Sequence, residues 1–376
     1  MYFWWSVLSE ELFEKVKIDE NYVRVSKDEL FNFIVRIFVK LGVPEEHARM
    51  VADNLVMADL HGIESHGVQR LKRYVDGIRK GGVNIKPNIR IVKEGSSYAL
   101  IDGDEGLGQV VGTFAMRLAI EKAKKTGIGV VVVRNSNHYG IAGYYALMAA
   151  KENLIGISMT NSRPLVAPTW GIERLLGTNP IALAAPMEDG YFLLDMATSV
   201  VPSGKLEVYR RKGKNIPEGW AMDKNGKITT DPEDFFAGGA LLPLGGFGEL
   251  HGGHKGYGLS VMVDILSGLL SGGAWSKYVG NTAEKNSNVC HFFMAINIEN
   301  FVPLDEFKRS ITKMANEIKS SKLHPQAQRI WIHGEKGFLT AKTRLRIGVP
   351  IYRKVFEEIN RIAEELGVEK LEPIKQ

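Results

Sequence analysis

The sequence predicts an α/β fold, and two observations support this prediction. Short apolar runs typical of strands alternate along the chain with longer stretches of helical apolar spacing. The second observation is residues 127–145, which predict a strand, a polar turn and a helix in direct succession. Four consecutive valines at 130–133 are followed by five polar residues that end at His138, and a new apolar pattern begins after Gly140. In open α/β sheets, ligands bind beyond the carboxyl ends of the strands, where a helix N-terminus offers free N–H groups. We expect a cofactor phosphate or a charged substrate at this turn; the alternative for His138 is a helix cap or a hydrogen bond within the loop.

Residues 26–82 predict helices. Ser26 and Glu29 have the spacing of a capping box, and apolar residues at helical spacing follow up to Gly42. Pro44 suits the first turn of a second helix, which should end near Gly62. A third helix is expected at residues 65–80, before two consecutive glycines.

Strands and helices alternate through the rest of the chain. We expect strands at residues 89–92, 98–101, 154–159, in GTNPIALAAP and FLLDMATS, and at 291–298 and 329–332. We expect helices at residues 109–126, 205–214, 254–273, 304–318 and 352–366. This order predicts an N-terminal extension at residues 1–20, a mainly helical part formed by 21–85 with 303–376, and an α/β cofactor-binding part at 86–302.

Composition narrows the class of protein. A formal charge of +5 over 376 residues, without a run of Lys and Arg, gives no indication of a nucleic-acid partner. The N-terminal segment is too short and too acidic for a signal peptide or a membrane span, so we expect no membrane partner. A single cysteine, Cys290, excludes an internal disulfide and fits a cytoplasmic location. Glu and Lys dominate the charges, which is typical of thermophilic proteins.

The fragment HGIESHGVQRLKRY at residues 61–74 is a second candidate site. If a helix begins at Ser65 or His66, then His66, Arg70 and Tyr74 share one helical face. Together they suit a small anionic substrate, because a guanidinium pairs with a carboxylate, a phenol donates a hydrogen bond and an imidazole exchanges a proton. Ser65 is placed to orient His66. The alternative is a solvated basic face formed by Arg70 and Arg73, with His66 as a cap.

Other chemistries have weaker signals. His61, Glu64 and His66 do not have the spacing of a helical zinc motif, and His251, His254 and His291 form the second candidate cluster. We expect no catalytic metal. There is no G-x-S-x-G elbow, and Cys290 lies inside an expected strand. No G-x-G-x-x-G occurs either, so a dinucleotide would need a fold other than the ordinary one.

Six motifs together carry a family resemblance. They are SHG with the downstream Arg70 and Tyr74, RNSNHYGIAG, TNSRPLVAPTWG, GTNPIALAAP, LDMATS and HKGYG, in this order. From about residue 22 to about residue 366 the chain resembles the type 2 malate/L-lactate dehydrogenase family, which includes sulfolactate and ureidoglycolate dehydrogenases. Within that family it is most similar to archaeal members from hyperthermophiles.

The resemblance implies a fold and an activity. The expected fold is a non-Rossmann NAD(P)-binding sheet with a discontinuous helical part, and the expected assembly is a homodimer or a dimer of dimers. The expected reaction is NAD- or NADP-dependent oxidation of an L-2-hydroxy acid, with L-malate favoured and L-sulfolactate, L-lactate or another 2-hydroxy acid as alternatives. The alternative of another class is a metal-dependent hydrolase that uses His251, His254 and His291.

The resemblance also implies roles for residues. It implies that His66 is the acid/base, linked to Ser65 and Asp195, although some members use the histidine at the position of His138. It places Arg70 and Tyr74 on the substrate. The implied cofactor contacts are His138, Tyr139, Gly140, Ile141, Ala142, Ser162, Asp195, Met196, Ala197, Lys255, Ile332, His333 and Gly334. Residues 277–288, near a region that affects substrate choice in relatives, do not match the family pattern.

Overall fold

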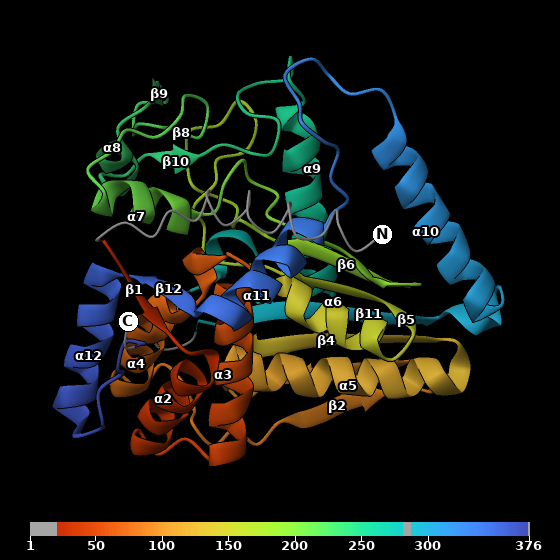
Figure 1. The fold of residues 1–376 in the computed structure, drawn as a ribbon, viewed down its shortest axis with the longest axis horizontal. Coiled ribbons are helices and arrows are strands. Elements are labelled where there is room, and N and C mark those ends of the chain that lie inside the picture. Colours follow the sequence, from red (N-terminus) through yellow and green to blue (C-terminus); the bar gives the residue numbers. More distant parts are fainter. Residues whose placement is uncertain (1–20, 281–286, 375–376) are drawn as a thin grey trace.

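The structure is a computed structural model that describes residues 21–280 and 287–374. Within these residues, seven strands form a central sheet in the order β2 (Arg90–Glu94), β3 (Tyr98–Asp102), β4 (Ile128–Ser136), β11 (Val289–Asn297), β5 (Leu154–Thr160), β6 (Ile181–Met187) and β7 (Gly190–Met196) (Figure 1). β3 and β4 are parallel, and the other neighbours are antiparallel. The α/β class is confirmed, and the sheet is mixed. The extension expected at residues 1–20 lies outside the described residues.

The valines of β4 alternate between the two faces of the sheet. Val131 and Val133 are fully buried in the core with α5 (Gly108–Thr126) and α6 (Ala142–Lys151). Val132 belongs to the core on the opposite face, with α9 (Gly253–Val263) and the π-helical segment Asp264–Leu269. A strand covered on both faces needs an apolar side chain at every position. The predicted buried strand is therefore confirmed, as is a helix that begins near residue 254, although Ile265, Leu269 and Leu270 after it are exposed.

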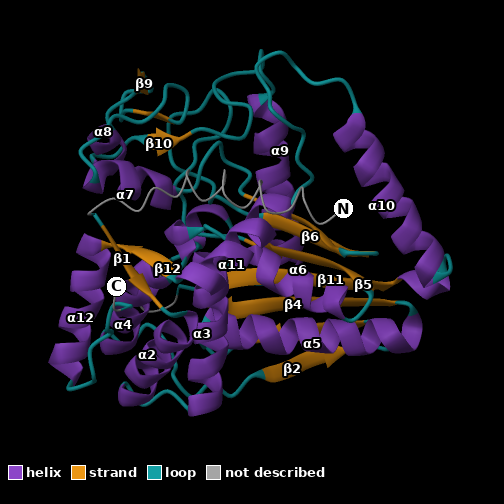
Figure 2. Ribbon diagram, in the orientation of Figure 1, coloured by secondary structure: helices purple, strands orange, loops and turns teal. Residues whose placement is uncertain are grey.

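A second hydrophobic core lies beside the sheet. It is built from α2 (Lys27–Lys40), α3 (Glu45–Leu60), α4 (Leu71–Arg79) and α12 (Arg353–Leu366), with the strand pair β1 (Tyr22–Val25) and β12 (Val349–Tyr352) (Figure 2). The Ser26 half of the expected capping box starts α2, because its hydroxyl accepts the Glu29 N–H at 3.1 Å; the Glu29 carboxylate pairs with Arg36 at 2.8 Å. We call this group the helical core and the group around α5 and α6 the sheet core.

The remaining described elements flank these two cores. A small sheet of β8 (Ala221–Met222), β9 (Ile228–Thr229) and β10 (Ala240–Leu241) lies with α7 (Ser203–Arg211) and α8 (Pro232–Phe236). α10 (Leu304–Ser320) packs beside β6, and α11 (Glu335–Ile347) contacts α3. The division of the chain at residues 85 and 303 remains a prediction. None of the described helices combines the length and the apolar character that crossing a bilayer requires.

The helix expected at residues 65–80 is wrong for its first part. The structure has 3₁₀ turns at Glu64–His66 and Val68–Arg70, and α4 begins only at Leu71. The reason is a contact from outside the segment: the buried Asp59 carboxylate accepts the Val68 N–H at 2.7 Å. Gly67, between the two turns, has ψ of −149°, far from the helical value, so the helix cannot run through it. A Cβ on Gly67 would lie only 1.8 Å from the Asp59 Oδ1 atom, so the chain passes where only glycine fits.

Asp59 should make stability depend on pH. Burial, opposed in part by the Val68 hydrogen bond, raises the pKa of Asp59 from 3.8 to about 8. The folded protein then keeps a proton that the unfolded chain releases, so stability should fall as pH rises from about 4 to about 8. Asp59→Asn keeps an acceptor for Val68 and cannot ionise. Between pH 6 and pH 8.5 we expect the free energy of unfolding of the wild type, measured with guanidinium chloride, to fall by about 1–3 kcal/mol. The free energy of unfolding of the variant should not show this fall. Equal pH dependence in both proteins would contradict this account.

The strand expected at residues 329–332 is also wrong. No strand of the described chain pairs with it; instead the Ile332 N–H donates to the Glu335 carboxylate at 2.9 Å, at the start of α11, and the Arg329 guanidinium lies 3.8 Å from the centre of the Trp331 ring. β1, β12 and α11 were not predicted. β1 pairs with β12, more than 300 residues away, and such a pairing leaves no local signal in four residues.

Candidate active site

A cavity lies where the helical core meets the sheet core. Its polar lining includes side chains from the turns before α4, from α4 itself, from the loop after β4 and from the segment after β5. These are His66, Arg70, Arg73, His138, Asn161, Ser162 and Arg163. The two candidate sites, 72 residues apart from His66 to His138, thus face one cavity. His66 and Arg70 thus reach the same cavity as His138 although the continuous helix predicted at residues 65–80 is absent.

Arg70 is held by the protein on two sides. Its Nε donates to the Ser65 carbonyl at 2.6 Å, and its Nη1 lies 3.3 and 3.2 Å from the two carboxylate oxygens of Glu207 on α7. Only 9% of Arg70 is exposed, so the alternative of a solvated basic face is wrong for this residue. Such a fixed guanidinium is pre-organised for a carboxylate.

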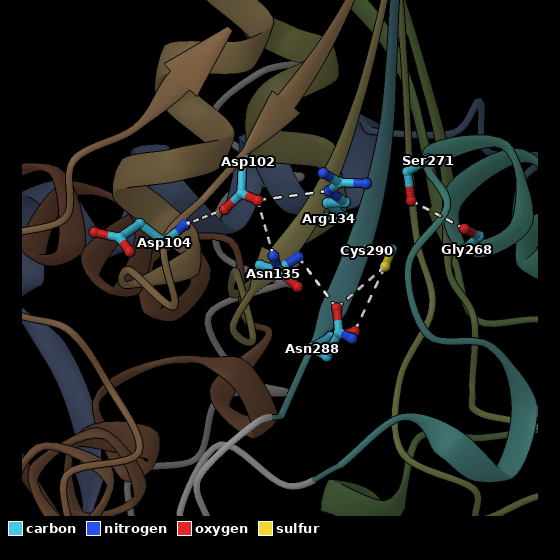
Figure 3. Close-up of polar contacts among 8 residues, drawn as sticks. All are labelled: Asp102, Asp104, Arg134, Asn135, Gly268, Ser271, Asn288 and Cys290. Atoms are coloured by element: carbon cyan, nitrogen blue, oxygen red, sulfur yellow. Dashed lines mark hydrogen bonds and ion pairs between the residues drawn. The ribbon is translucent and has the colours of Figure 1, made fainter. Parts of the chain in front are cut away.

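The end of β4 is fixed by a polar network that includes neighbouring strands (Figure 3). Asn135 adopts a left-handed conformation with φ of 51° and donates its backbone N–H to Asn288 at 3.1 Å. Its side-chain amide donates to the Asp102 carboxylate at 2.9 Å, and the Arg134 Nε lies 3.5 Å from the same oxygen. The change of direction at Asn135 leads the chain into the loop that carries His138. These contacts make the loop part of the rigid sheet.

Asn137 ties the same loop to a second one. Its buried side-chain amide donates to the carbonyls of Glu105 at 2.7 Å and Gly106 at 3.2 Å. Gly140, with φ of +80°, then passes so close to α3 that a Cβ would lie 1.8 Å from the Asn54 Oδ1 atom. The loop therefore joins the two cores at a position where a side chain has no room.

The hydrogen bonds of His138 define its tautomer. Its Nδ1 accepts the Gly140 N–H at 3.3 Å, so Nδ1 carries no proton, and the Tyr74 hydroxyl at 2.7 Å must donate to it as well. The neutral ring then carries its proton on Nε2. The loop hydrogen bond considered for His138 is thus present, in a residue that also faces the cavity.

His66 is placed differently. Its Nδ1 lies 2.9 Å from the Ser65 hydroxyl, and its ring stacks on that of His138 with centroids 5.7 Å apart. If Nδ1–H donates to Ser65, Nε2 has a free lone pair and can accept a proton.

Both imidazoles are neutral in this environment. Burial, followed by the charges of Arg70 and Arg73, lowers the pKa of His66 to about 3. Burial, followed by the charge of Arg73, also lowers the pKa of His138 well below its ordinary value. A neutral imidazole is the form that can take a proton from a hydroxyl group.

Asp195 contacts the start of α6. The hydrogen bond that its carboxylate makes within the described chain is with the Gly143 N–H, at 2.7 Å, in the first turn of α6. One of the N–H groups that we expected to meet an anionic ligand is therefore used by Asp195. Burial, opposed by this hydrogen bond, raises the pKa of Asp195 to about 6. Asp195 consequently fixes the start of α6 and the loop before it.

Some of the expected cofactor residues line the cavity, and the others lie on elements around it. His138, Tyr139, Gly140 and Ser162 line the cavity. Ile141 and Ala142 follow them into α6, whereas Asp195, Met196 and Ala197 lie at the end of β7. The Leu193 N–H donates to the His333 carbonyl at 3.1 Å, which places Ile332, His333 and Gly334 beside β7; Lys255 lies in the first turn of α9.

This set fits a nicotinamide cofactor. The aromatic ring of Tyr139 is stacked between Tyr145 and His291, each with ring centroids 4.6 Å away, so both of its faces are covered and it anchors the loop to the sheet core. Beside it, Gly140 leaves backbone without a side chain, and Ser162 supplies a hydroxyl. A nicotinamide ring carries an amide group, which needs a few polar partners of this kind at the wall of a cavity.

The alternative metal site does not form. His291 is fully buried, and its ring nitrogens contact the Thr160 hydroxyl at 2.7 Å and the Ser136 hydroxyl at 2.8 Å. His251 and His254 are exposed at and just before the start of α9. Among the residues that the structure describes, no three His, Cys, Asp or Glu side chains are grouped as metal ligands.

Three functional candidates were not predicted from the sequence. Arg73 and Arg163 line the cavity, and Glu207 holds Arg70. Arg163 lies within the motif TNSRPLVAPTWG, so its position next to the strand end was a usable signal. Glu207 is 137 residues from Arg70 and has no local signal.

Comparison with known proteins identifies the family. The model of the malate/L-lactate dehydrogenase family matches residues 25–360. The chain therefore belongs to the malate/L-lactate dehydrogenase family, and it is an oxidoreductase.

Relatives agree over nearly the whole chain. The malate dehydrogenase of Pyrococcus horikoshii is 75% identical over 360 residues, which cover 96% of this chain and 100% of the relative. The malate/(S)-sulfolactate dehydrogenase of Methanothermus fervidus is 43% identical, with 92% of this chain and 98% of the relative covered. A solved structure of the Pyrococcus horikoshii OT3 malate dehydrogenase has a TM-score of 0.89 at 72% identity, and covers 94% of this chain and 98% of that one. The predicted family and the non-Rossmann fold are confirmed, and nothing supports the hydrolase.

Proposed function

We propose that this protein oxidises L-malate to oxaloacetate with NAD or NADP. The observation that carries the proposal is the cavity in which two histidines meet three guanidinium groups of the described chain. The 75% identity to a malate dehydrogenase supports the choice of substrate. Following the family resemblance, we also propose a homodimer or a dimer of dimers, in the cytoplasm.

Arg70 would bind the C1 carboxylate. Because Ser65 and Glu207 already fix its guanidinium, little side-chain entropy is lost when the substrate binds. Tyr74 would act through His138, to which its hydroxyl donates. Holding C2 in the reacting orientation can supply several kcal/mol of the rate enhancement.

His66 would accept the hydroxyl proton. In the neutral tautomer defined by Gly140, His138 carries a proton on Nε2 and can only donate there, whereas His66 with Nδ1–H on Ser65 has an Nε2 lone pair. His138 would then hold the substrate oxygen by a hydrogen bond. The bound nicotinamide would supply the acceptor for the C2 hydride, and His138, Tyr139, Gly140, Ser162 and the β7 and α9 residues named above would hold the cofactor.

A substrate panel crossed with both cofactors tests the proposal. We expect the highest kcat/KM with L-malate, measured by NADH or NADPH absorbance against L-sulfolactate, L-lactate and ureidoglycolate. L-Sulfolactate is the second candidate, because a sulfonate also pairs with guanidinium groups and a relative carries that name. Failure of every 2-hydroxy acid with both cofactors would refute the proposed function.

The lowered pKa of His66 predicts opposite pH dependences in the two directions. With a pKa of about 3 in the free enzyme, the base form is complete at neutral pH, so kcat/KM for malate oxidation should be flat from about pH 6 to about pH 8. Oxaloacetate reduction needs the protonated imidazole, whose fraction falls about tenfold per pH unit above the pKa, so its kcat/KM should fall as pH rises. Steady-state rates in both directions check this. An oxidation profile with a step near pH 7 would show a less perturbed base.

A further inference from the structure

Two guanidinium groups in the cavity have no part in the reaction as described so far. Arg73 comes from α4 and Arg163 from the segment after β5, so they approach from the helical core and the sheet side respectively. They accompany His66 and Arg70 in the lining. Guanidinium groups of separate elements that face one cavity are typical of anion recognition.

Arg70 is largely committed by its own contacts. Its Nε is used by the Ser65 carbonyl, and its Nη1 faces both oxygens of Glu207, whose charge offsets that of Arg70. Gly204 lies beside the remaining nitrogen, Nη2; a Cβ there would be 2.4 Å away, so the glycine leaves Nη2 facing the cavity. Arg70 can therefore take one carboxylate at its remaining edge. A substrate with two anionic groups needs a second cationic site.

Arg73 and Arg163 supply the necessary charge. Burial lowers the pKa of Arg73 to about 10, and repulsion from Arg70 and from Arg163 contributes to this shift. Arg73 therefore remains charged at neutral pH. No acidic side chain is among the described residues that line the cavity. An anion between these guanidinium groups would relieve their mutual repulsion, whereas a methyl group in the same place would not.

We propose that Arg73 and Arg163 form a second anion subsite, which binds the distal carboxylate of a dicarboxylic 2-hydroxy acid while Arg70 binds C1. This inference rests on the proposed function of the same cavity. It makes Arg73 and Arg163 the residues that select a dianionic substrate over a monocarboxylate such as L-lactate. A distal sulfonate would use the same pair.

The test is a change in selectivity in the full-length protein. Arg163→Met and Arg73→Met should each lower kcat/KM for L-malate by about 100-fold, since a buried charged partner is lost, and change kcat/KM for L-lactate by less than about threefold. L-Sulfolactate should follow L-malate. Arg163→Lys and Arg73→Lys keep the charge and should restore part of the malate preference. Arg70→Met should weaken both substrates.

Controls separate the subsite from folding and from the proposed function. Arg210→Met removes a half-exposed guanidinium of α7 that pairs with Glu233, and should leave the malate-to-lactate ratio unchanged. Thermal unfolding of each variant shows whether it folds. Where a Met variant does not fold, the corresponding Lys variant is used to measure the selectivity. If the wild type oxidises no 2-hydroxy acid, the proposed function fails, and thermal shifts with L-malate and L-lactate still measure selectivity. Equal losses for both substrates, or none for L-malate, would overturn the subsite.

Discussion

Arg70→Met is expected to lower kcat/KM for L-malate by at least about 1000-fold, because the carboxylate loses a charge-assisted hydrogen-bonding partner in a buried site. Affinity for NADH should stay within about twofold, since the expected cofactor residues form their own hydrogen bonds. The loss should appear mainly in kcat, because a mispositioned C2 affects the transition state more than the bound ground state. Steady-state kinetics and fluorescence titration of NADH measure the two quantities.

Glu207 requires a control in this experiment. Without Arg70, the Glu207 carboxylate loses its partner and could repel the substrate by itself. The double variant Arg70→Met with Glu207→Gln removes that repulsion and should remain as slow as Arg70→Met. Near-normal turnover by either variant would exclude Arg70 from substrate binding.

His66→Ala is expected to abolish the chemical step, with a loss of about 100- to 10,000-fold in single-turnover hydride transfer, the range for a general acid/base. The pH dependence of oxaloacetate reduction should disappear with it. His138→Ala should slow the same step by a smaller factor and retain the pH dependence, since His138 offers a proton donor on Nε2 and does not accept there.

Tyr74→Phe is the matched control for His138. It removes the hydroxyl that donates to Nδ1 and leaves the Gly140 contact, so it should resemble His138→Ala with a weaker effect. If His138→Ala instead removes both the chemical step and its pH dependence, the proton acceptor is His138. If neither histidine variant does so, the proton passes through another group.

The sequence predicted features that short segments determine. The Ser26 cap and the valine run of β4 depend on neighbours in the chain, and both are present. The turns at residues 64–70 depend on Asp59, which lies against Gly67 and accepts the Val68 N–H where the backbone leaves the helical conformation. The pairing of β1 with β12 joins opposite ends of the chain, so four residues alone could not indicate it.

In the candidate site, too, residues in local motifs could be predicted and residues that act through distant contacts could not. His66, Arg70 and His138 lie in motifs, and the cavity brings them together as predicted, although their roles remain proposals. Glu207 comes from a helix without any motif, and its importance follows only from its contact with Arg70. The link between Asp195 and His66 stays a prediction, and the contact of Asp195 with Gly143 could not be read from the motif, because a sequence motif does not show which way a side chain points.

The cavity takes His66 and Arg70 from the helical core and His138 and Ser162 from the sheet core. The two cores have separate apolar clusters, and α3 packs against α5 where they meet. We expect this junction to loosen before either core unfolds. Catalytic activity therefore reports the docking of the two bodies, and circular dichroism reports the helices and strands inside each. On heating, enzyme rate should decline before ellipticity does, and the interval between the two transitions would measure how firmly one half holds the other.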